Sequence, residues 1–198
     1  MSRTRRTLCL NMIVRNEAPI IERSLRSAAD HVGHWVVCDT GSSDATPGIV
    51  QSLFSDLGIP GELHRFPFEN FEQARNQALD LARASSAKFD YILLMDADME
   101  LVVRDATFGE RLTAPAYRVL QKSNISYWNT RLLARDAPAR YRGVTHECLE
   151  VPPGEAPLSD IWFIDHADGS NRKEKFARDL ALLKAAIEQE PDNCRHVF

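Results

Sequence analysis

The chain has 198 residues, of which 44% are hydrophobic and 26% are charged, and its net charge at pH 7 is −4. Such a chain can bury the core of one globular domain, so we expect a single domain over residues 1–198. The acidic balance excludes a general attraction to nucleic acid. No apolar segment reads as a signal peptide or membrane span, and the four cysteines form no C-x-x-C or zinc pattern. We expect a cytoplasmic protein whose cysteines are reduced. The protein would be either free in the cytoplasm or peripheral at the membrane face.

Apolar runs and helical periodicity alternate along the first hundred residues. Residues 8–14 form a continuous apolar run that predicts a strand, and residues 19–29 carry apolar side chains at helical spacing. The same alternation predicts strands at 35–38, 59–66 and 91–95 and helices at 45–57 (with Asp44 as N-cap and Gly58 as stop) and 70–84. This pattern indicates a parallel sheet covered by helices, with a ligand crevice beyond the carboxyl ends of the strands.

The second half of the chain has a different pattern of apolar runs and turns. Short strand candidates at residues 117–120, 127–133 and 160–164 are separated by turns that contain Pro and Gly, which predicts a mixed or antiparallel addition. Residues 173–188 then predict a helix that ends before Pro191. Its expected inward face consists of Phe176, Leu180, Leu183 and Ile187.

Two aspartates, Asp96 and Asp98, follow the predicted strand at residues 91–95, with the small Ala97 between them. The alternation of side chains lets both carboxylates leave the same edge of the turn. Carboxylate oxygens suit Mg²⁺ or Mn²⁺, which proteins usually hold with one or two acids plus the phosphates of a substrate. Such a pair alone is more often a solvated turn, but a second acidic strand end at Asp39 favours a metal site.

Four segments follow one another along the chain: residues 10–17 (LNMIVRNE), 37–46 (VCDTGSSDAT), 74–76 (ARN) and 94–101 (LMDADMEL). Together they resemble the signatures of family-2 glycosyltransferases. A later Val144-Thr-His-Glu147 element and His166 are similar to the branch that includes lipopolysaccharide-core glucosyltransferases and peptide S-glycosyltransferases. The resemblance implies the α/β GT-A fold, which is a Rossmann-like, mainly parallel sheet flanked by helices with a smaller mixed or antiparallel addition on the acceptor side.

The implied activity is metal-dependent, inverting transfer of a sugar from a UDP-sugar donor to a glycan, lipid-linked sugar or peptide acceptor. Residues 1–100 would then form the nucleotide-binding half, residues 101–170 the acceptor and catalytic half, and residues 171–190 a C-terminal helix. Relatives commonly continue into helical repeats, so a helical-repeat region missing from the C-terminal side is a further expectation.

The resemblance also implies which residues bind the donor. Asn11, Ile13, Arg15 and Glu17 would line the base pocket, Asp39 would contact the uracil or ribose, Arg75 would close the base side, and Asp96 with Ala97 would hold the ribose. For Arg15, Glu17 and Arg75 the alternative is ordinary surface salt bridging. For Asp39 the alternative is a turn or a helix cap.

The same resemblance assigns Asp98 as the direct ligand of Mn²⁺ or Mg²⁺, Asp96 as a partner through a metal-bound water, and His166 as a late third ligand. Glu147 is the predicted base that deprotonates the acceptor. His146 is the second candidate, or the residue that orients Glu147, and a polar strand rim is the alternative for both.

Weaker signals concern the diphosphate and the acceptor. Basic side chains of Arg172, Lys173 and Lys175 could reach a diphosphate, although a solvated helix face explains the same charges. Trp128 and Tyr141 could form a sugar platform, although core packing is the stronger interpretation of each.

Two other functions stay open. A nucleotidyltransferase would also use a carboxylate-held metal, but it should carry a glycine-rich first loop, and residues 14–18 contain no glycine. A non-catalytic sugar-nucleotide-binding module is the other alternative.

Overall fold

The computed structural model of the chain describes residues 6–170, 175–190 and 193. The first half alternates strands and helices as its periodicity predicts. Its elements are β1 (Leu8–Val14), α1 (Ile21–Ala29), β2 (His34–Asp39), α2 (Thr46–Asp56), β3 (Gly61–Arg65), α3 (Phe71–Ala84) and β4 (Tyr91–Leu94). The remaining elements are β5 (Met99–Val103), the 3-10 helix η1 (Phe108–Arg111), β6 (Ala116–Lys122), β7 (Ser126–Ala134), β8 (Arg140–Arg142), β9 (Cys148–Glu150), β10 (Ala156–Asp165) and α4 (Lys175–Gln189).

One eight-stranded sheet organises the molecule, with the strand order β3-β2-β1-β4-β7-β6-β10-β5. The four strands β3, β2, β1 and β4 are parallel, whereas β7 joins β4 in the antiparallel sense. β6 is antiparallel to β7 and parallel to β10, and β5 closes the edge antiparallel to β10. The predicted mixed addition therefore continues the same sheet, and β8 and β9 form a separate two-stranded sheet.

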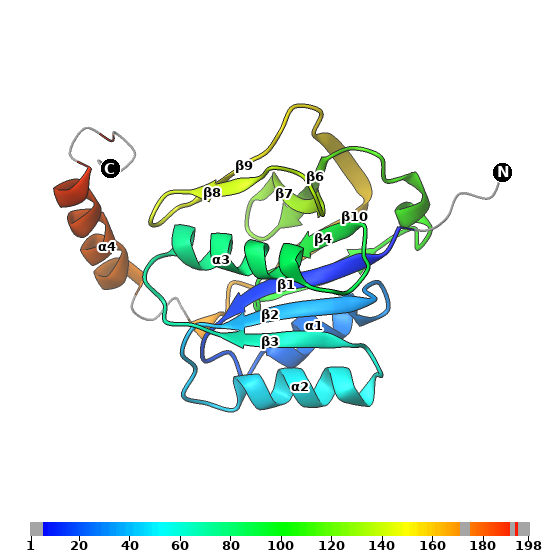
Figure 1. Ribbon diagram of the computed structural model, residues 1–198, viewed down its shortest axis with the longest axis horizontal. Coiled ribbons are helices and arrows are strands. Elements are labelled where there is room, and N and C mark those ends of the chain that lie inside the picture. Colours follow the sequence, from blue (N-terminus) through cyan, green and yellow to red (C-terminus); the bar gives the residue numbers. More distant parts are fainter. Residues whose placement is uncertain (1–5, 171–174, 191–192, 194–198) are drawn as a thin grey trace.

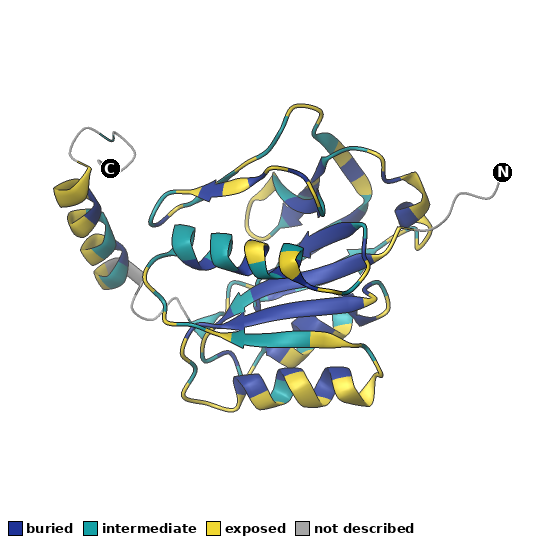
Figure 2. Ribbon diagram, viewed as in Figure 1, coloured by how far each residue is buried: buried dark blue, intermediate teal, exposed yellow. Residues whose placement is uncertain are grey.

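Helices cover both faces of the parallel strands (Figure 1). Helices α1 and α2 pack on one face around Leu25, Phe54 and the side chains of β1 that point toward them, such as Leu10. Helix α3 packs on the other face through Ala78 and Leu79. Because both faces are covered, β1 and β2 are buried almost throughout, as Figure 2 shows, and this explains their continuous apolar runs.

Two local details explain how helices α2 and α3 begin. Asn70 is the N-cap of α3, and its side chain accepts a hydrogen bond from the backbone N–H of Gln73 at 2.8 Å. The prediction for α2 was wrong by one residue, because the N-cap position is Ala45 and the helix begins at Thr46. Asp44 still satisfies a free backbone group there, since its carboxylate accepts from the Thr46 N–H at 3.0 Å.

The periodicity did not predict β8 and β9, nor the 3-10 helix η1. Strands β8 and β9 have three residues each, which is too short for an alternation to stand out from chance. In contrast, β6, β7 and β10 contain the three predicted strands and extend beyond each of them.

Helix α4 projects from one end of the molecule, beside the carboxyl ends of β1, β2 and β3 (Figure 1). Two residues of its expected inward face are exposed, Leu180 to 55% and Ile187 to 38%, and Leu183 is partly buried. The helix meets the domain instead near its start, where the Arg178 guanidinium lies 4.8 Å from the centre of the Phe71 ring and Asp179 is buried. Pro191 and the side chain of Phe176 lie outside the described residues. Within the described part of the chain, no helix combines the length and apolar character that crossing a membrane requires.

Candidate active site

A cleft of about 1060 Å³ opens beyond the carboxyl ends of the parallel strands. This is the edge at which open α/β sheets bind ligands, and the volume is large for a ligand pocket. Both halves of the chain contribute to the cleft, together with the first turns of α4. The lining includes residues 13–17, Thr40, residues 96–99, Gln121, Tyr127, Arg131, residues 145–147, Asp165, Gly169, Ser170, Arg178 and Asp179.

Ile13 at the end of β1 and Arg15 and Glu17 in the loop after it line the cleft, and their contact with a nucleotide stays a prediction. Glu17 is only 7% exposed, and its carboxylate accepts hydrogen bonds from the backbone N–H and the hydroxyl of Ser170, both at 3.0 Å. Burial raises the pKa of Glu17, although the bonds from Ser170 oppose the shift. The Ser170 hydroxyl also lies 2.7 Å from the Arg15 carbonyl oxygen. The segment after β10 is thus held against the loop that follows β1.

Asn11 and Asp39 do not line the cleft. The Asn11 amide donates to the carbonyl oxygens of Val36 and Ala78, both at 3.1 Å, and so joins β1 to β2 and α3. Asp39 is 1% exposed, and its carboxylate accepts from the Ser42 N–H at 2.8 Å and pairs with Arg65 at 3.0 Å. Both side chains therefore hold the framework beside the cleft in this structure, and nucleotide contact by either stays a prediction.

Asp96 is bound on both sides by arginine. Arg75 donates to one carboxylate oxygen at 2.8 Å and Arg131 donates to the other at 3.0 Å. Burial alone would raise the pKa of Asp96, but the two guanidinium groups outweigh it and hold the pKa well below its ordinary value. The two arginines therefore favour the ionised form of Asp96, and both of its carboxylate oxygens are already hydrogen-bonded.

Arg75 connects Asp96 to the predicted base. Its Nε donates to Glu147 at 2.5 Å, and its guanidinium lies 5.5 Å from the centre of the Tyr141 ring. The pKa of Arg75 is raised, because the two carboxylates outweigh the effect of burial. Arg75 thus binds protein carboxylates in this structure. Its contact with the nucleobase stays a prediction.

The sequence interpretation missed Arg131 and Gln121. Arg131 lies on β7, is 6% exposed, and donates to the side-chain oxygen of Gln121 at 2.7 Å. Gln121 lies on β6, is 2% exposed, and donates to Asp165 at 3.1 Å. Gln121 continues the alternation of the buried Tyr117 and Val119 on β6, and a polar side chain on the buried face of a strand was the signal that could have identified it.

Asp98 lies in the cleft, close to the segment that follows β10. A side-chain carbon added at Gly169 would lie 3.1 Å from a carboxylate oxygen of Asp98, so the glycine keeps space beside this acid. The carbonyl oxygen of Asp98 accepts from the His166 backbone N–H at 3.0 Å.

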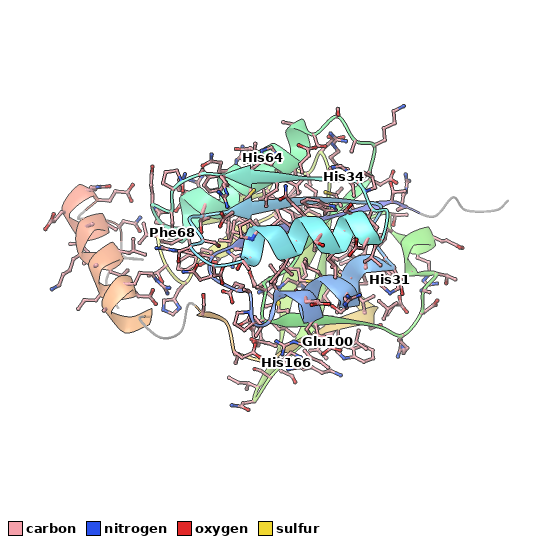
Figure 3. All side chains as sticks on the ribbon, turned by 90° about the horizontal axis from the view of Figure 1, so that it is seen from below. His31, His34, His64, Phe68, Glu100 and His166 are labelled. Atoms are coloured by element: carbon pink, nitrogen blue, oxygen red, sulfur yellow. The ribbon has the colours of Figure 1, made fainter. Side chains whose placement is uncertain are left out.

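The ring of His166 does not face the cleft. Its Nε2 lies 3.0 Å from the Glu100 carboxylate, and both residues are labelled in Figure 3. Among the described residues, no three His, Cys, Asp or Glu side chains are arranged to hold a metal ion. Metal binding by Asp98 and by His166 stays a prediction, and ligation through Nε2 of His166 requires the ring to turn away from Glu100.

The remaining predictions concern the acceptor side. His146 and Glu147 both line the cleft, and His146 has a left-handed backbone with φ of 50°. Tyr141 is buried beneath Arg75, as core packing requires. Trp128 is 46% exposed and lies outside the lining, where Tyr127 is found instead. Arg172, Lys173 and the side chain of Lys175 lie outside the described residues.

The model of the family Glycosyl transferase family 2 matches residues 9–103, which include β1, β2, β4 and the two aspartates. A TPR repeat-containing protein of Synechococcus elongatus is 35% identical over 153 residues, which cover 73% of this chain and 35% of that protein. This chain belongs to glycosyltransferase family 2. The glycosyltransferase SunS of the Bacillus subtilis SPbeta prophage is 24% identical over 213 residues, which cover 97% of this chain and 48% of SunS.

Solved structures confirm the GT-A fold of this family-2 member. Staphylococcus aureus TarS superposes on 91% of the chain with a TM-score of 0.59 and 14% identity, and the match covers 40% of TarS. Glucosyl-3-phosphoglycerate synthase of Mycobacterium tuberculosis superposes on 93% of the chain with a TM-score of 0.51 and 14% identity, and the match covers 80% of the synthase. The chain spans between about a third and a half of the curated relatives it matches.

Proposed function

We propose that this family-2 glycosyltransferase domain transfers a sugar from a UDP-sugar to an acceptor with inversion, with the help of Mn²⁺ or Mg²⁺. Residues 1–100 supply the donor half of the cleft, and residues 101–170 supply the acceptor half. The synthase whose fold the chain shares was solved with Mn²⁺, UDP and glucosyl-3-phosphoglycerate, which supports the choice of donor and metal.

The charge of the cleft is the observation that carries the proposal. Among the described lining residues, four arginines face seven carboxylates, which leaves an excess of three negative charges. A sugar diphosphate is itself anionic, so these described side chains together repel it, and a bound cation would offset that repulsion. A divalent metal would neutralise the departing diphosphate, and Asp98 beside Gly169 is the carboxylate placed to hold it.

The other residues then take distinct roles. Ile13, Arg15 and Glu17 form one wall of the nucleotide pocket, because they stand at the carboxyl end of β1. Glu147 accepts the proton of the acceptor hydroxyl or thiol as it attacks the anomeric carbon, and His146 borders the same space. Arg75 binds one oxygen of the Glu147 carboxylate, Oε1, so the other oxygen can accept the proton while this bond holds the group in place.

Two variants separate the roles of the two acids. Calorimetry with UDP in the presence and absence of Mn²⁺ measures donor binding, and release of UDP from a panel of UDP-sugars measures turnover. We expect Asp98→Ala to abolish the metal-dependent binding of UDP. Glu147→Gln should retain UDP binding and lower turnover by about a hundredfold or more.

Asp80→Asn is a matched control, because Asp80 is an exposed acid on α3 that pairs with Arg140 away from the cleft. Wild-type protein that fails to bind UDP with Mn²⁺ would contradict the proposal. Binding without turnover of any donor would support the non-catalytic module, and turnover of a nucleoside triphosphate would support a nucleotidyltransferase.

A further inference from the structure

A continuous chain of side-chain hydrogen bonds crosses the floor of the cleft. Asp165 at the end of β10 accepts from Gln121 at 3.1 Å, and Gln121 accepts from Arg131 at 2.7 Å. Arg131 donates to Asp96 at 3.0 Å. Beyond Asp96, Arg75 extends the chain by donating to Asp96 at 2.8 Å and to Glu147 at 2.5 Å. These five hydrogen bonds thus connect β10 to Glu147, the predicted catalytic base.

Every residue of this hydrogen-bond network lines the cleft, and most of the side chains in the network are shielded from water. The side chains of Arg131, Arg75, Asp96 and Glu147 are 7%, 16%, 22% and 15% exposed. Hydrogen bonds between charged groups are strong when water is excluded. The position of each group in the chain is therefore set by its neighbours, and a displacement of Arg131 is passed on to Asp96 and Arg75.

Arg131 has a feature that a purely structural residue would not be expected to keep. Its Nε is buried and has no hydrogen-bond partner among the described residues. A buried donor without a partner lowers stability. Its two Nη groups serve two different acceptors at once, Asp96 and Gln121, which only the planar guanidinium fork can do. The unpartnered Nε of Arg131 thus lowers the stability of the fold, whereas the two Nη groups orient Asp96 and Gln121 in the cleft.

We propose that Arg131, held by Gln121, is a positioning residue for the transfer reaction: it fixes Asp96, which fixes Arg75, which places the carboxylate of Glu147. The inference rests on the proposed function, because it concerns the base of that reaction. It also gives different roles to the two acids of the turn Asp96-Ala97-Asp98. Asp96 belongs to this network of contacts and orients the acceptor side, whereas Asp98 stands outside the network, beside Gly169.

The proposal predicts a specific split between binding and turnover. Arg131→Met removes both Nη contacts, so Glu147 loses its fixed position while Asp98 and the loop after β1 are untouched. We expect kcat for release of UDP from the best donor to fall by about 10- to 100-fold. The donor KM and the Kd for UDP with Mn²⁺ should stay within about threefold of wild type.

Conservative variants keep the test valid if Arg131→Met folds poorly. Arg131→Lys retains the charge but reaches one acceptor, so its kcat should lie between those of wild type and Arg131→Met. Gln121→Met leaves the Arg131–Asp96 contact without its support and should lower kcat in the same direction by a smaller factor. Arg118→Met is the matched control, because Arg118 lies on β6, pairs with Glu155 at 3.1 Å and stands outside the cleft lining.

The possible results separate this inference from the function on which it rests. Wild-type protein that neither binds UDP with Mn²⁺ nor releases UDP from a donor overturns the proposed function itself. If the wild type is active, a kcat of Arg131→Met equal to that of Arg118→Met overturns the positioning role. A loss of UDP affinity that matches the loss of kcat also overturns it, because Arg131 would then contribute to donor binding. A fall in kcat alone, with partial recovery in Arg131→Lys, supports it.

Discussion

Removal of Arg75 should destabilise the domain measurably, because this side chain neutralises two acids in a shielded place. Its contacts with Asp96 and Glu147 are 2.8 and 2.5 Å long, and all three side chains are less than a quarter exposed. Breaking a buried ion pair by deleting one partner costs about 3–5 kcal/mol. Arg131 still neutralises Asp96, and some solvent reaches Glu147, so we expect about 2–3 kcal/mol for Arg75→Met.

Thermal and urea unfolding followed by circular dichroism measure this cost. In a domain of this size, 2–3 kcal/mol corresponds to a fall in Tm of about 5–10 °C. The double variant Arg75→Met/Glu147→Gln should recover about 1 kcal/mol, since it removes the acid that has lost its partner. Arg118→Met removes a side chain that is 49% exposed and leaves Glu155 bonded to the Thr130 hydroxyl, so it should stay within about 0.5 kcal/mol of wild type. An equal cost for Arg75→Met and Arg118→Met, or no recovery in the double variant, would refute the network.

Two further predictions test the groups around the loop after β1. Asn11→Ala should lower the free energy of unfolding by about 1–3 kcal/mol, because two buried carbonyl oxygens each lose a hydrogen-bond donor. UDP affinity should not change, and a loss of affinity without a loss of stability would show that Asn11 binds the nucleotide. The raised pKa of Glu17 means that the folded state holds this proton more tightly than the unfolded state does. Wild-type stability should therefore fall relative to Glu17→Gln as pH rises above about 4.3, as urea unfolding at pH 4 and pH 8 would detect. The exposed Glu22 gives the control Glu22→Gln, and a pH trend of Glu17→Gln no different from that control would contradict this prediction.

Much of the first half was predictable because its signals are local. A strand covered on both faces must be apolar throughout, and an amphipathic helix must repeat its apolar side chains every three to four residues. These rules placed β1, β2, β4 and α3 within a few residues. They also placed Asp96 and Asp98 at a strand end, where an α/β sheet presents its ligand site.

The sequence could not decide which neighbour each polar side chain meets. Asn11 belongs to a motif that resembles a nucleotide pocket, yet its amide bonds the backbone of β2 and α3 because of the face on which it emerges. Helix α4 has a clear apolar periodicity, but Leu180 is more than half exposed, although Arg178 near the start of the helix contacts Phe71. Periodicity identifies an apolar face without showing whether another element covers it.

The sequence by itself determined the family, the alternation of strands and helices, and the acidic turn at residues 96–98. Only the tertiary structure decided that Asp96 is bound between two arginines, whereas Asp98 stands beside Gly169. The network draws on three different elements, with Arg75 on α3, Arg131 on β7 and Gln121 on β6. No spacing along the chain reveals that these side chains come together. Their meeting depends on β7 pairing beside β4 in a defined register, and such long-range pairing is fixed by the packing of the whole sheet.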